Sequence, residues 1–146
     1  MKLDSPVKAC AVLLALLLML ALAAGCSSSA RSASKAAETL LTYEKFNQWD
    51  EVWEMMHPDS QASWESRSAF LNEFPKATSN LKSFELGKAK KLHSWTLPST
   101  RKTYDGVAEI PATLVYSTTS GEIERSSIMH PVFYDGEWRF FRNPVN

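Results

Sequence analysis

Hydrophobic and polar residues recur with different periods along the chain, and these periods predict its elements. Residues 9–24 carry no charged or strongly polar side chain, and residues 27–35 are small and polar. Between positions 36 and 75 apolar residues recur at steps of three or four, which is typical of amphipathic helices. From residue 88 onward they recur at about every second position, which is typical of β-strands. Helices followed by strands predict a segregated α+β fold class.

The apolar run over residues 9–24 matches a secretory signal better than a membrane span. A helix needs about 20 apolar residues to cross a bilayer, so this run is too short. Lys2 and Lys8 precede the run and small residues follow it, which is the layout of a signal peptide. Its end, LAAGC at residues 22–26, resembles a bacterial lipobox. That resemblance implies cleavage before Cys26 and attachment of acyl chains to Cys26.

Two other roles are open to Cys26, a buried thiol or one half of a disulfide. Cys10 is the only other cysteine and lies inside the predicted signal peptide, so no intramolecular disulfide can survive cleavage. Several acyl chains on one residue anchor a protein firmly, because each buried methylene contributes about 0.8 kcal/mol. We therefore expect a lipid anchor at the extracytoplasmic face of the cell membrane, or a periplasmic location if the cell has two membranes.

The patterns divide the chain into three regions. We expect a lipoprotein signal peptide over residues 1–25 and a lipidated flexible tether over residues 26–35, where SSSARSASK has nothing to bury. Residues 36–146 have the length of one domain and leave no room for a second.

Charge argues against a nucleic-acid partner. Without Lys2, Lys8 and Asp4, the exported part has 14 basic and 15 acidic residues, derived from 16 of each in the whole chain. Nucleic-acid binding needs a basic face. The densest basic group, KAKK at residues 88–91, is more typical of a solvated strand edge than of a binding patch. The acyl chains are thus the expected contact with the membrane.

The first helical region is expected to break into two helices. Its apolar stripe consists of Leu40, Tyr43, Phe46, Trp49, Trp53 and Met56. Asn47 and Asp50 favour local hydrogen bonds, which predicts a break near Gln48 and an Asp50 cap on the second helix. Pro58 is expected to end this second helix at or before His57.

A third helix is expected between two prolines. Asp59 or Ser60 is the predicted cap, and Pro75 is expected to stop the helix. The predicted inward residues are Trp64, Phe70, Leu71 and Phe74. Their aromatic character favours packing against a broad sheet.

In the second half, strands are expected over residues 88–97 and 107–117, joined by a loop. The second strand places on one face Ala108, Ile110, Ala112, Leu114 and Tyr116. Pro111 and Pro131 cannot donate to a ladder, so each marks an edge, a bulge or a bend. Asp135-Gly136 between two β-rich runs predicts a two-residue type I′ hairpin, with Trp138 and Phe140 on the same side.

These motifs together carry a family resemblance. LLTYEKFNQWDEVWEMMHPDS, a helix near FLNEFP, the strand GVAEIPATLVYSTTSGEIERSS and the closing VFYDGEWRF are similar to the NTF2-like, cystatin-related superfamily, especially its small bacterial extracytoplasmic lipoproteins. The resemblance implies N-terminal helices packed on a strongly bent antiparallel sheet, which forms a cone with an apolar cavity. Its implied pocket residues are Trp49, Trp53, Trp95, Tyr116 and His130.

Catalysis in such a cone requires an acid and a base in the cavity, because an apolar environment moves pKa values toward the working range. The candidates are Asp50, His93, Tyr116 and His130. Asp50 also fits a helix cap, and Tyr116 with His130 also fits a cross-strand packing pair. No pair at motif spacing links them, so we expect no catalytic residue.

Metal and cofactor sites are not expected either. His57, His93 and His130 are widely separated, and no H-E-x-x-H motif or second exported cysteine accompanies them. HPDS at residues 57–60 fits a helix stop followed by a cap, without any chemistry.

The expected function is therefore non-enzymatic: a membrane-anchored lipoprotein that binds a protein partner or a small apolar ligand at the bacterial cell envelope. The alternative is an isomerase-like or dehydratase-like enzyme that uses the cone cavity. A structural homodimer is a third class. A buried acid and base within hydrogen-bond reach would favour the enzyme. A cavity filled by tryptophan side chains would leave no room for substrate.

Overall fold

The computed structural model describes residues 29–78 and 80–144. The predicted signal peptide and Cys26 lie outside the described residues. Within the described ranges, no helix combines the length and the hydropathy that a membrane crossing requires.

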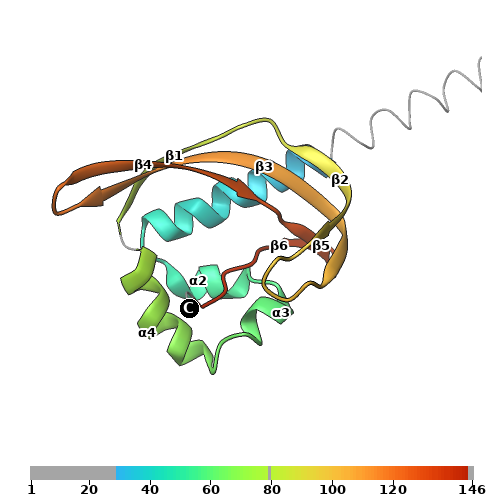
Figure 1. Cartoon of the computed structure of the whole chain (residues 1–146), viewed down its shortest axis with the longest axis horizontal. Coiled ribbons are helices and arrows are strands. Elements are labelled where there is room, and N and C mark those ends of the chain that lie inside the picture. The colour runs from blue at the N-terminus through green and yellow to red at the C-terminus, as the bar shows by residue number, and fades with distance from the viewer. Residues whose placement is uncertain (1–28, 79, 145–146) are drawn as a thin grey trace, which may run out of the picture.

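The first helix covers residues 29–45 and lies along the concave side of the sheet (Figure 1). Its buried stripe consists of Ala33, Ala37, Leu40, Leu41 and Glu44. The flexible tether predicted over residues 26–35 is wrong from residue 29 onward, because Ala33 is fully buried and Ser32 Oγ accepts a 2.9 Å hydrogen bond from the Trp138 indole N–H. Small side chains let this part of the helix pack closely against the rest of the domain. The polar stretch from residue 29 is therefore part of the domain and not of a tether.

The second helix, α2, covers Trp49–Glu54 after a turn at residues 46–47. Two predictions are wrong here. Phe46 is 64% exposed, because the turn directs it away from the stripe to which it was assigned. Asp50 lies in the first turn of α2 rather than at its cap position, and its carboxylate accepts a 2.8 Å hydrogen bond from Arg67.

The region predicted as a third helix forms two elements, α3 over Pro58–Gln61 and α4 over Arg67–Thr78. The cap of α3 is His57 rather than Asp59 or Ser60, because the His57 ring accepts a hydrogen bond from the Asp59 backbone N–H. Pro75 lies inside α4 and does not stop it. The predicted inward residues Phe70 and Phe74 are buried on α4, and Trp64 is buried in the connection before it.

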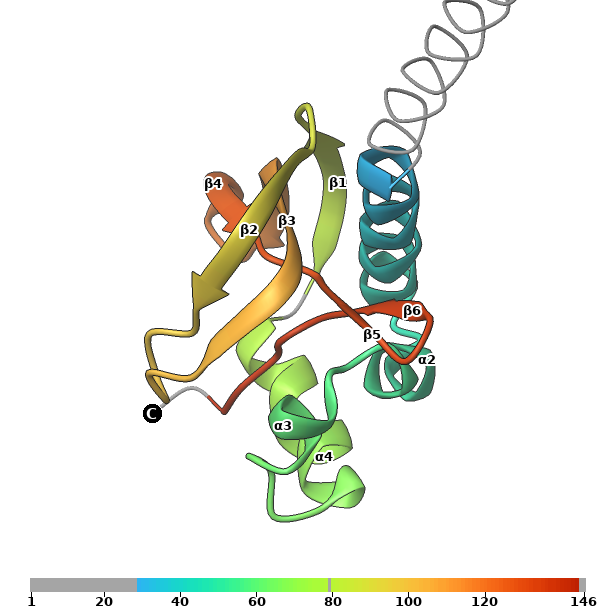
Figure 2. The ribbon, with the colours of Figure 1, turned by 90° about the vertical axis from the view of Figure 1, so that its right-hand side faces the viewer.

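The described part of the chain contains one six-stranded antiparallel sheet, curled into a half-barrel over the first helix (Figures 1 and 2). Its strands are β1 (Leu81–Leu86), β2 (Lys90–Thr96), β3 (Thr103–Thr118), β4 (Gly121–Met129), β5 (Val132–Tyr134) and β6 (Glu137–Arg139). The 16-residue β3 pairs with β1 and β2 along one edge and with β4 and β5 along the other. The predicted α+β fold class, with N-terminal helices on a strongly bent antiparallel sheet, is confirmed.

Both prolines mark places where β3 changes partner. Pro111 lies between Glu109, which pairs with β2, and Ala112, which pairs with β1. Pro131 lies between β4 and β5. Each therefore marks a bend between partner strands, and Pro111 is not at a sheet edge. The Gly87 N–H, in the gap between β1 and β2, donates to the Pro111 carbonyl at 2.7 Å.

The strand predictions are confirmed in the main and differ at two points. The predicted buried face of β3 is confirmed, with Tyr116 half-buried at its end. Strand β1 was not expected, and β3 begins at Thr103 and runs through Gly106, where a loop was predicted. Asp135 and Gly136 have φ values of 50° and 82°, which confirms the β5–β6 hairpin with both turn residues at positive φ.

Apolar side chains form two clusters. The main core lies between the helices and the sheet, and its centre is Phe70, whose ring contacts those of Trp53, Trp64 and Phe74 at centroid distances of 5.0–5.3 Å. The second cluster consists of Leu97, Tyr104, Val107 and Val132, with Leu92, Trp95 and Phe141 packed against it.

Candidate functional site

A cavity of about 400 Å³ lies where the main core meets the second cluster. The first helix, the sheet and the segment after β6 supply its walls. The apolar wall residues include Leu41, Leu97, Leu114, Met129, Phe140 and Phe141. The polar groups are Glu44, Tyr116, Ser127, His130, Arg142 and Asn143.

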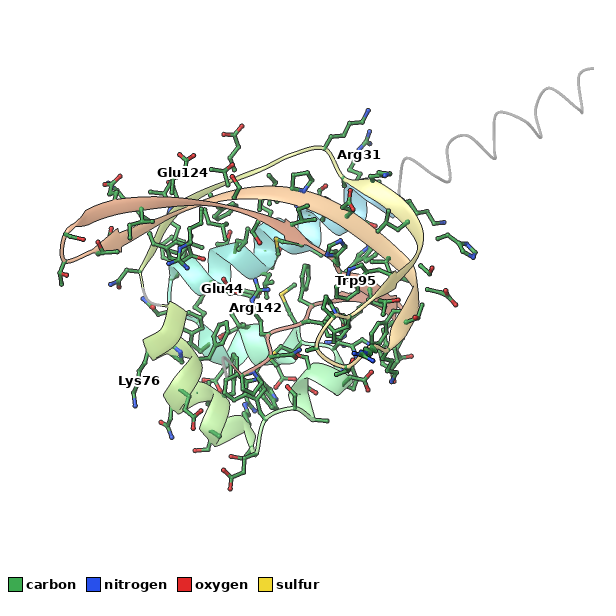
Figure 3. The ribbon with its side chains drawn as sticks, in the orientation of Figure 1. Arg31, Glu44, Lys76, Trp95, Glu124 and Arg142 are labelled. Atoms are coloured by element: carbon green, nitrogen blue, oxygen red, sulfur yellow. The ribbon has the colours of Figure 1, made fainter. Side chains whose placement is uncertain are left out.

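An ion pair joins two walls of this cavity. Arg142 Nε donates a 2.6 Å hydrogen bond to Glu44 Oε1, and the Glu44 residue is only 7% exposed (Figure 3). Arg142 Nη1 also donates to the Phe141 carbonyl at 3.1 Å. The buried Glu44 carboxylate and the half-buried Arg142 guanidinium neutralise each other, and hydrogen bonds offset part of their desolvation. The pair therefore adds polar atoms to the cavity without adding net charge.

Backbone hydrogen bonds hold Arg142 in place. The Arg142 N–H donates to Ser60 Oγ at 2.8 Å, and its carbonyl accepts a 2.7 Å hydrogen bond from the Trp64 indole N–H. The Phe140 carbonyl accepts a 2.8 Å hydrogen bond from the His57 N–H. Residues 140–143 thus lie fixed along α3 and form one side of the cavity.

His130 and Trp95 form a planar part of the wall. Their rings stack with centroids 4.6 Å apart and an interplanar angle of 10°. Burial lowers the pKa of His130, and the Glu109 carboxylate, 3.7 Å from His130 Nε2, opposes this only in part. The imidazole is therefore neutral at pH 7 and can accept or donate a hydrogen bond.

Tyr116 contributes a phenol group to the same cavity. Burial raises its pKa, and the nearby Glu44 raises it further, so the hydroxyl stays protonated. Tyr116 pairs with Ile123, whereas His130 follows Met129, whose partner is Ile110. Tyr116 and His130 are therefore not opposite each other on the ladder, as a cross-strand pair would require. The curl of the sheet brings both to the cavity.

Only part of the predicted pocket lines this cavity. Trp95, Tyr116 and His130 do so. Trp49 instead contacts Phe74 and Trp53 contacts Phe70, with centroids 5.8 and 5.3 Å apart, so both belong to the main core. Their position on α2 directs them toward α4 rather than toward the cavity.

The other catalytic candidates are elsewhere. Asp50 and His93 are exposed on α2 and β2, away from the cavity. Within the ranges 29–78 and 80–144, no three metal-ligating side chains come together.

Sequence reasoning missed the Glu44–Arg142 pair, since 98 positions separate its members. One signal was present: Glu44 continues the buried stripe of the first helix, where a charged residue requires a partner.

A second polar arrangement surrounds His57, which is 4% exposed. Its ring contacts those of Tyr104, Tyr134 and Phe141, at centroid distances of 4.8–5.2 Å. Its Nδ1 accepts a 3.1 Å hydrogen bond from the Asp59 N–H, which caps α3. Burial lowers the pKa of His57 and keeps the ring neutral for this role.

Asp59 extends this arrangement to the β2–β3 connection. Its carboxylate accepts hydrogen bonds from Lys102 Nζ at 2.6 Å and from the Tyr104 hydroxyl at 2.7 Å. These two bonds lower the pKa of Asp59. The sequence indicated that HPDS forms a helix stop and cap, but its aromatic and lysine partners are more than 40 positions away.

Comparison with known proteins gives no family assignment, since no protein-family model and no curated protein matches the chain. The similarity to the NTF2-like superfamily stays a prediction from the sequence motifs.

Proposed function

We propose that this chain is an envelope lipoprotein, anchored through acyl chains on Cys26, whose NTF2-like domain binds a small uncharged amphipathic ligand. The observation that carries the ligand-binding part is the cavity with its internally neutralised Glu44–Arg142 pair. The LAAGC motif supports the anchor and an extracytoplasmic location.

The size and lining of the cavity support a small ligand over a protein partner. Small-molecule sites are concave and mostly apolar, with a few convergent polar groups, and have volumes of roughly 300–1,000 Å³. This cavity of about 400 Å³ lies near the lower end of that range. The stacked Trp95 and His130 rings offer a flat surface for a planar group.

The charges at the cavity support an uncharged ligand. The two charged lining residues, Glu44 and Arg142, neutralise each other, and His130 is neutral. A charged ligand would lose hydration without finding an unpaired opposite charge, which is costly in a partly buried site. A neutral ligand with a hydrogen-bonding group meets donors and acceptors at low desolvation cost.

The experiment compares three single-ring probes that differ in charge: benzamide, benzoate and benzylammonium. Binding is measured by NMR titration of the unaltered chain and of Glu44→Gln, Arg142→Gln and the double variant. The unaltered chain and the double variant should prefer benzamide. Glu44→Gln leaves Arg142 unpaired and should shift the preference to benzoate by about tenfold, whereas Arg142→Gln should shift it to benzylammonium.

Two matched controls change the same charges outside the cavity. Glu38 and Lys45 lie on the exposed side of the first helix. Glu38→Gln and Lys45→Gln should therefore leave the benzamide preference unchanged. The same order of affinities in all the cavity variants, or no binding of any probe, contradicts the proposed site.

The anchor is tested separately. Cys26→Ser should abolish acylation and move the protein out of the membrane fraction, because its only proposed lipid attachment is lost. Mass spectrometry of the unaltered exported protein should show a diacylglycerol-modified cysteine at the new N-terminus. An unmodified thiol or an uncleaved signal peptide contradicts this part of the proposal.

An isomerase-like or dehydratase-like enzyme is the second candidate function. His130, with Glu109 beside it, supplies a neutral base, and Tyr116 supplies an acid at the same cavity. Binding without catalysis remains the favoured proposal, because among the described residues the one carboxylate that lines the cavity, Glu44, is engaged by Arg142. Exchange of α-protons of cyclic ketones in D₂O, lost in both His130→Gln and Tyr116→Phe, would support the enzyme instead.

A further inference from the structure

The start of the first helix lies close to the proposed anchor point. Only Ser27 and Ser28 separate Cys26 from residue 29, the first described helical residue. A link of this length spans about 10 Å at most, at no more than about 3.6 Å per residue. Provided that Cys26 carries acyl chains as proposed, the N-terminal end of this helix is the part of the domain nearest the bilayer.

Folding brings a second segment to this end. Arg31 and Lys35 of the first helix line one groove together with Leu86 and Gly87, at the end of β1. The basic segment over residues 88–91 follows directly. Figures 2 and 3 show the β1–β2 connection beside the start of the helix, with Arg31 at this end and Lys76 far from it.

We call this surface the basic end and define it as Arg31, Lys35, Lys88, Lys90 and Lys91. All five side chains are exposed. Among the residues that the structure describes, none of the five takes part in an ion pair. Five other basic residues do: Arg67, Lys82, Lys102, Arg139 and Arg142.

Three carboxylates lie at or beside the basic end. Glu38 and Glu85 line the groove, and Glu109 pairs with Lys90 across the strands. Counted together, five cations and three carboxylates leave an excess of two positive charges at the basic end. The exported part as a whole has 14 basic and 15 acidic residues, so its total charge is slightly negative. Clusters of four to eight basic side chains next to a membrane attract anionic lipids.

We propose that the basic end rests against anionic phospholipid headgroups and so fixes the orientation of the domain on its membrane. The short link and the unpaired cations act together, since the link keeps the start of the helix within about 10 Å of the anchor, a distance comparable to the screening length of about 8 Å at physiological salt. Glu44 lies 13 residues beyond Arg31 on the same helix, about 20 Å farther along its axis at 1.5 Å per residue. The Glu44 side of the cavity is thereby kept away from the headgroups.

The test measures how fast each lysine reacts with an amine-acetylating reagent, read by mass spectrometry. The lipidated full protein is reconstituted into vesicles of phosphatidylcholine alone or of equimolar phosphatidylcholine and phosphatidylglycerol. On the anionic vesicles, Lys35, Lys88, Lys90 and Lys91 should react at least about threefold more slowly, and high salt should remove this protection. Lys45 and Lys76 are exposed internal controls and should react equally on both vesicles.

A pair of charge-matched variants shows whether the location of the charges matters. The first replaces Lys88, Lys90 and Lys91 by glutamine, and the second replaces Lys45, Lys76 and Arg125 by glutamine. Both lose three positive charges from exposed positions. Lys35 should lose its protection on anionic vesicles in the first variant and keep it in the second.

Equal reactivity on both vesicles, or equal protection of Lys35 in both variants, overturns the proposed orientation. The mass of the Cys26 peptide is measured in the same samples and separates the two proposals. A lipidated Cys26 with unprotected lysines contradicts the orientation alone. An unmodified Cys26 contradicts the anchor and, with it, this inference.

Discussion

The main core and the second cluster use aromatic side chains in different ways. In the main core, Phe70 and its neighbours contact one another between helices and sheet, with apolar groups on every side. In the second cluster, Tyr104 contacts the ring of His57 and donates a hydrogen bond to Asp59. The first arrangement depends chiefly on close packing, with hydrogen bonds only from the indole N–H groups of Trp64 and Trp138, and the second depends also on protonation.

This difference separates stability from function within one small domain. The main core holds the helices against the sheet, and its stability should depend little on pH because its buried side chains carry no ionisable group. The second cluster borders the cavity, and Phe141, the neighbour of Arg142 in the chain, packs against it. The following changes test that division in order of decreasing effect.

Phe70→Ala should have the largest effect, because it removes a fully buried ring from the centre of the main core. Large-to-small changes of this kind reduce the free energy of unfolding by about 3–5 kcal/mol. Urea denaturation followed by circular dichroism measures the loss. Phe133→Ala, at an exposed phenylalanine, is the control and should cost far less. Equal losses in the two variants would contradict the assignment of Phe70 to the core.

Gly136→Val should have the next largest effect, since the hairpin connects the two clusters through Val132 and Trp138. Gly136 has a φ of +82°, and an added Cβ meets no atom within 4 Å, so the cost comes from the backbone alone. We expect a loss of about 1–2 kcal/mol in the free energy of unfolding. Gly136→Asn should cost less, because asparagine tolerates positive φ. An unchanged melting temperature in Gly136→Val would contradict this reasoning.

Tyr104→Phe isolates the hydrogen bond between the second cluster and Asp59. The phenyl ring keeps its packing, and only the 2.7 Å bond from the hydroxyl is lost. We expect the free energy of unfolding to fall by about 1 kcal/mol. Tyr134→Phe, at an exposed ring that also contacts His57, is the matched control. A larger loss in the control would show that the hydrogen bond is not the stabilising feature.

The smallest effect is a difference in pH dependence. Burial lowers the pKa of His57 below its ordinary value of 6.5, so below that pH the unfolded chain binds a proton that the folded chain excludes. The stabilising contribution is complete above pH 6.5 and declines as the pH falls below it. His130 acts in the same direction.

The variant His57→Asn separates the two histidines. Asparagine can still cap α3 but does not titrate in this range, so stability should fall less steeply with acid than in the unaltered chain. Melting temperatures are recorded from pH 7.5 down to about pH 5, a range that spans the ordinary histidine pKa. The slope of melting temperature against pH is then compared between the proteins. His130→Asn is measured in parallel. The same slope in all three proteins would exclude both histidines as its cause.

Local patterns were sufficient to predict much of the fold. The alternation along β3 and the Asp135-Gly136 turn depend on neighbouring residues, so the sequence indicates both directly. The helical residues 29–35 were missed because they consist of serine, alanine and two basic residues, without a large apolar side chain. The informative feature was the four-residue spacing from Ala33 to Ala37, which the burial of Leu41 continues.

The site was harder to predict because its contacts join distant segments. Trp95, Tyr116 and His130 were selected by residue type and line the cavity, whereas Trp49 and Trp53 share their type but belong to the main core. The Glu44–Arg142 pair and the surroundings of His57 depend on how the sheet curls. The partner strands of β3 change at Pro111 and Pro131. The sequence indicated an edge, a bulge or a bend at each proline, but not how the sheet curls there.

Residues 140–143 complete both the main core and the cavity. A ribosome adds these residues after it has made every helix and strand described above, and they supply the wall that carries Arg142. A chain that ends at Arg139 lacks the Phe140 side chain, which is fully buried in the main core, and the Arg142 partner of the buried Glu44 carboxylate. We expect such a truncated chain to be less stable than the whole domain, so the proposed binding site cannot be removed at this end without weakening the fold that carries it.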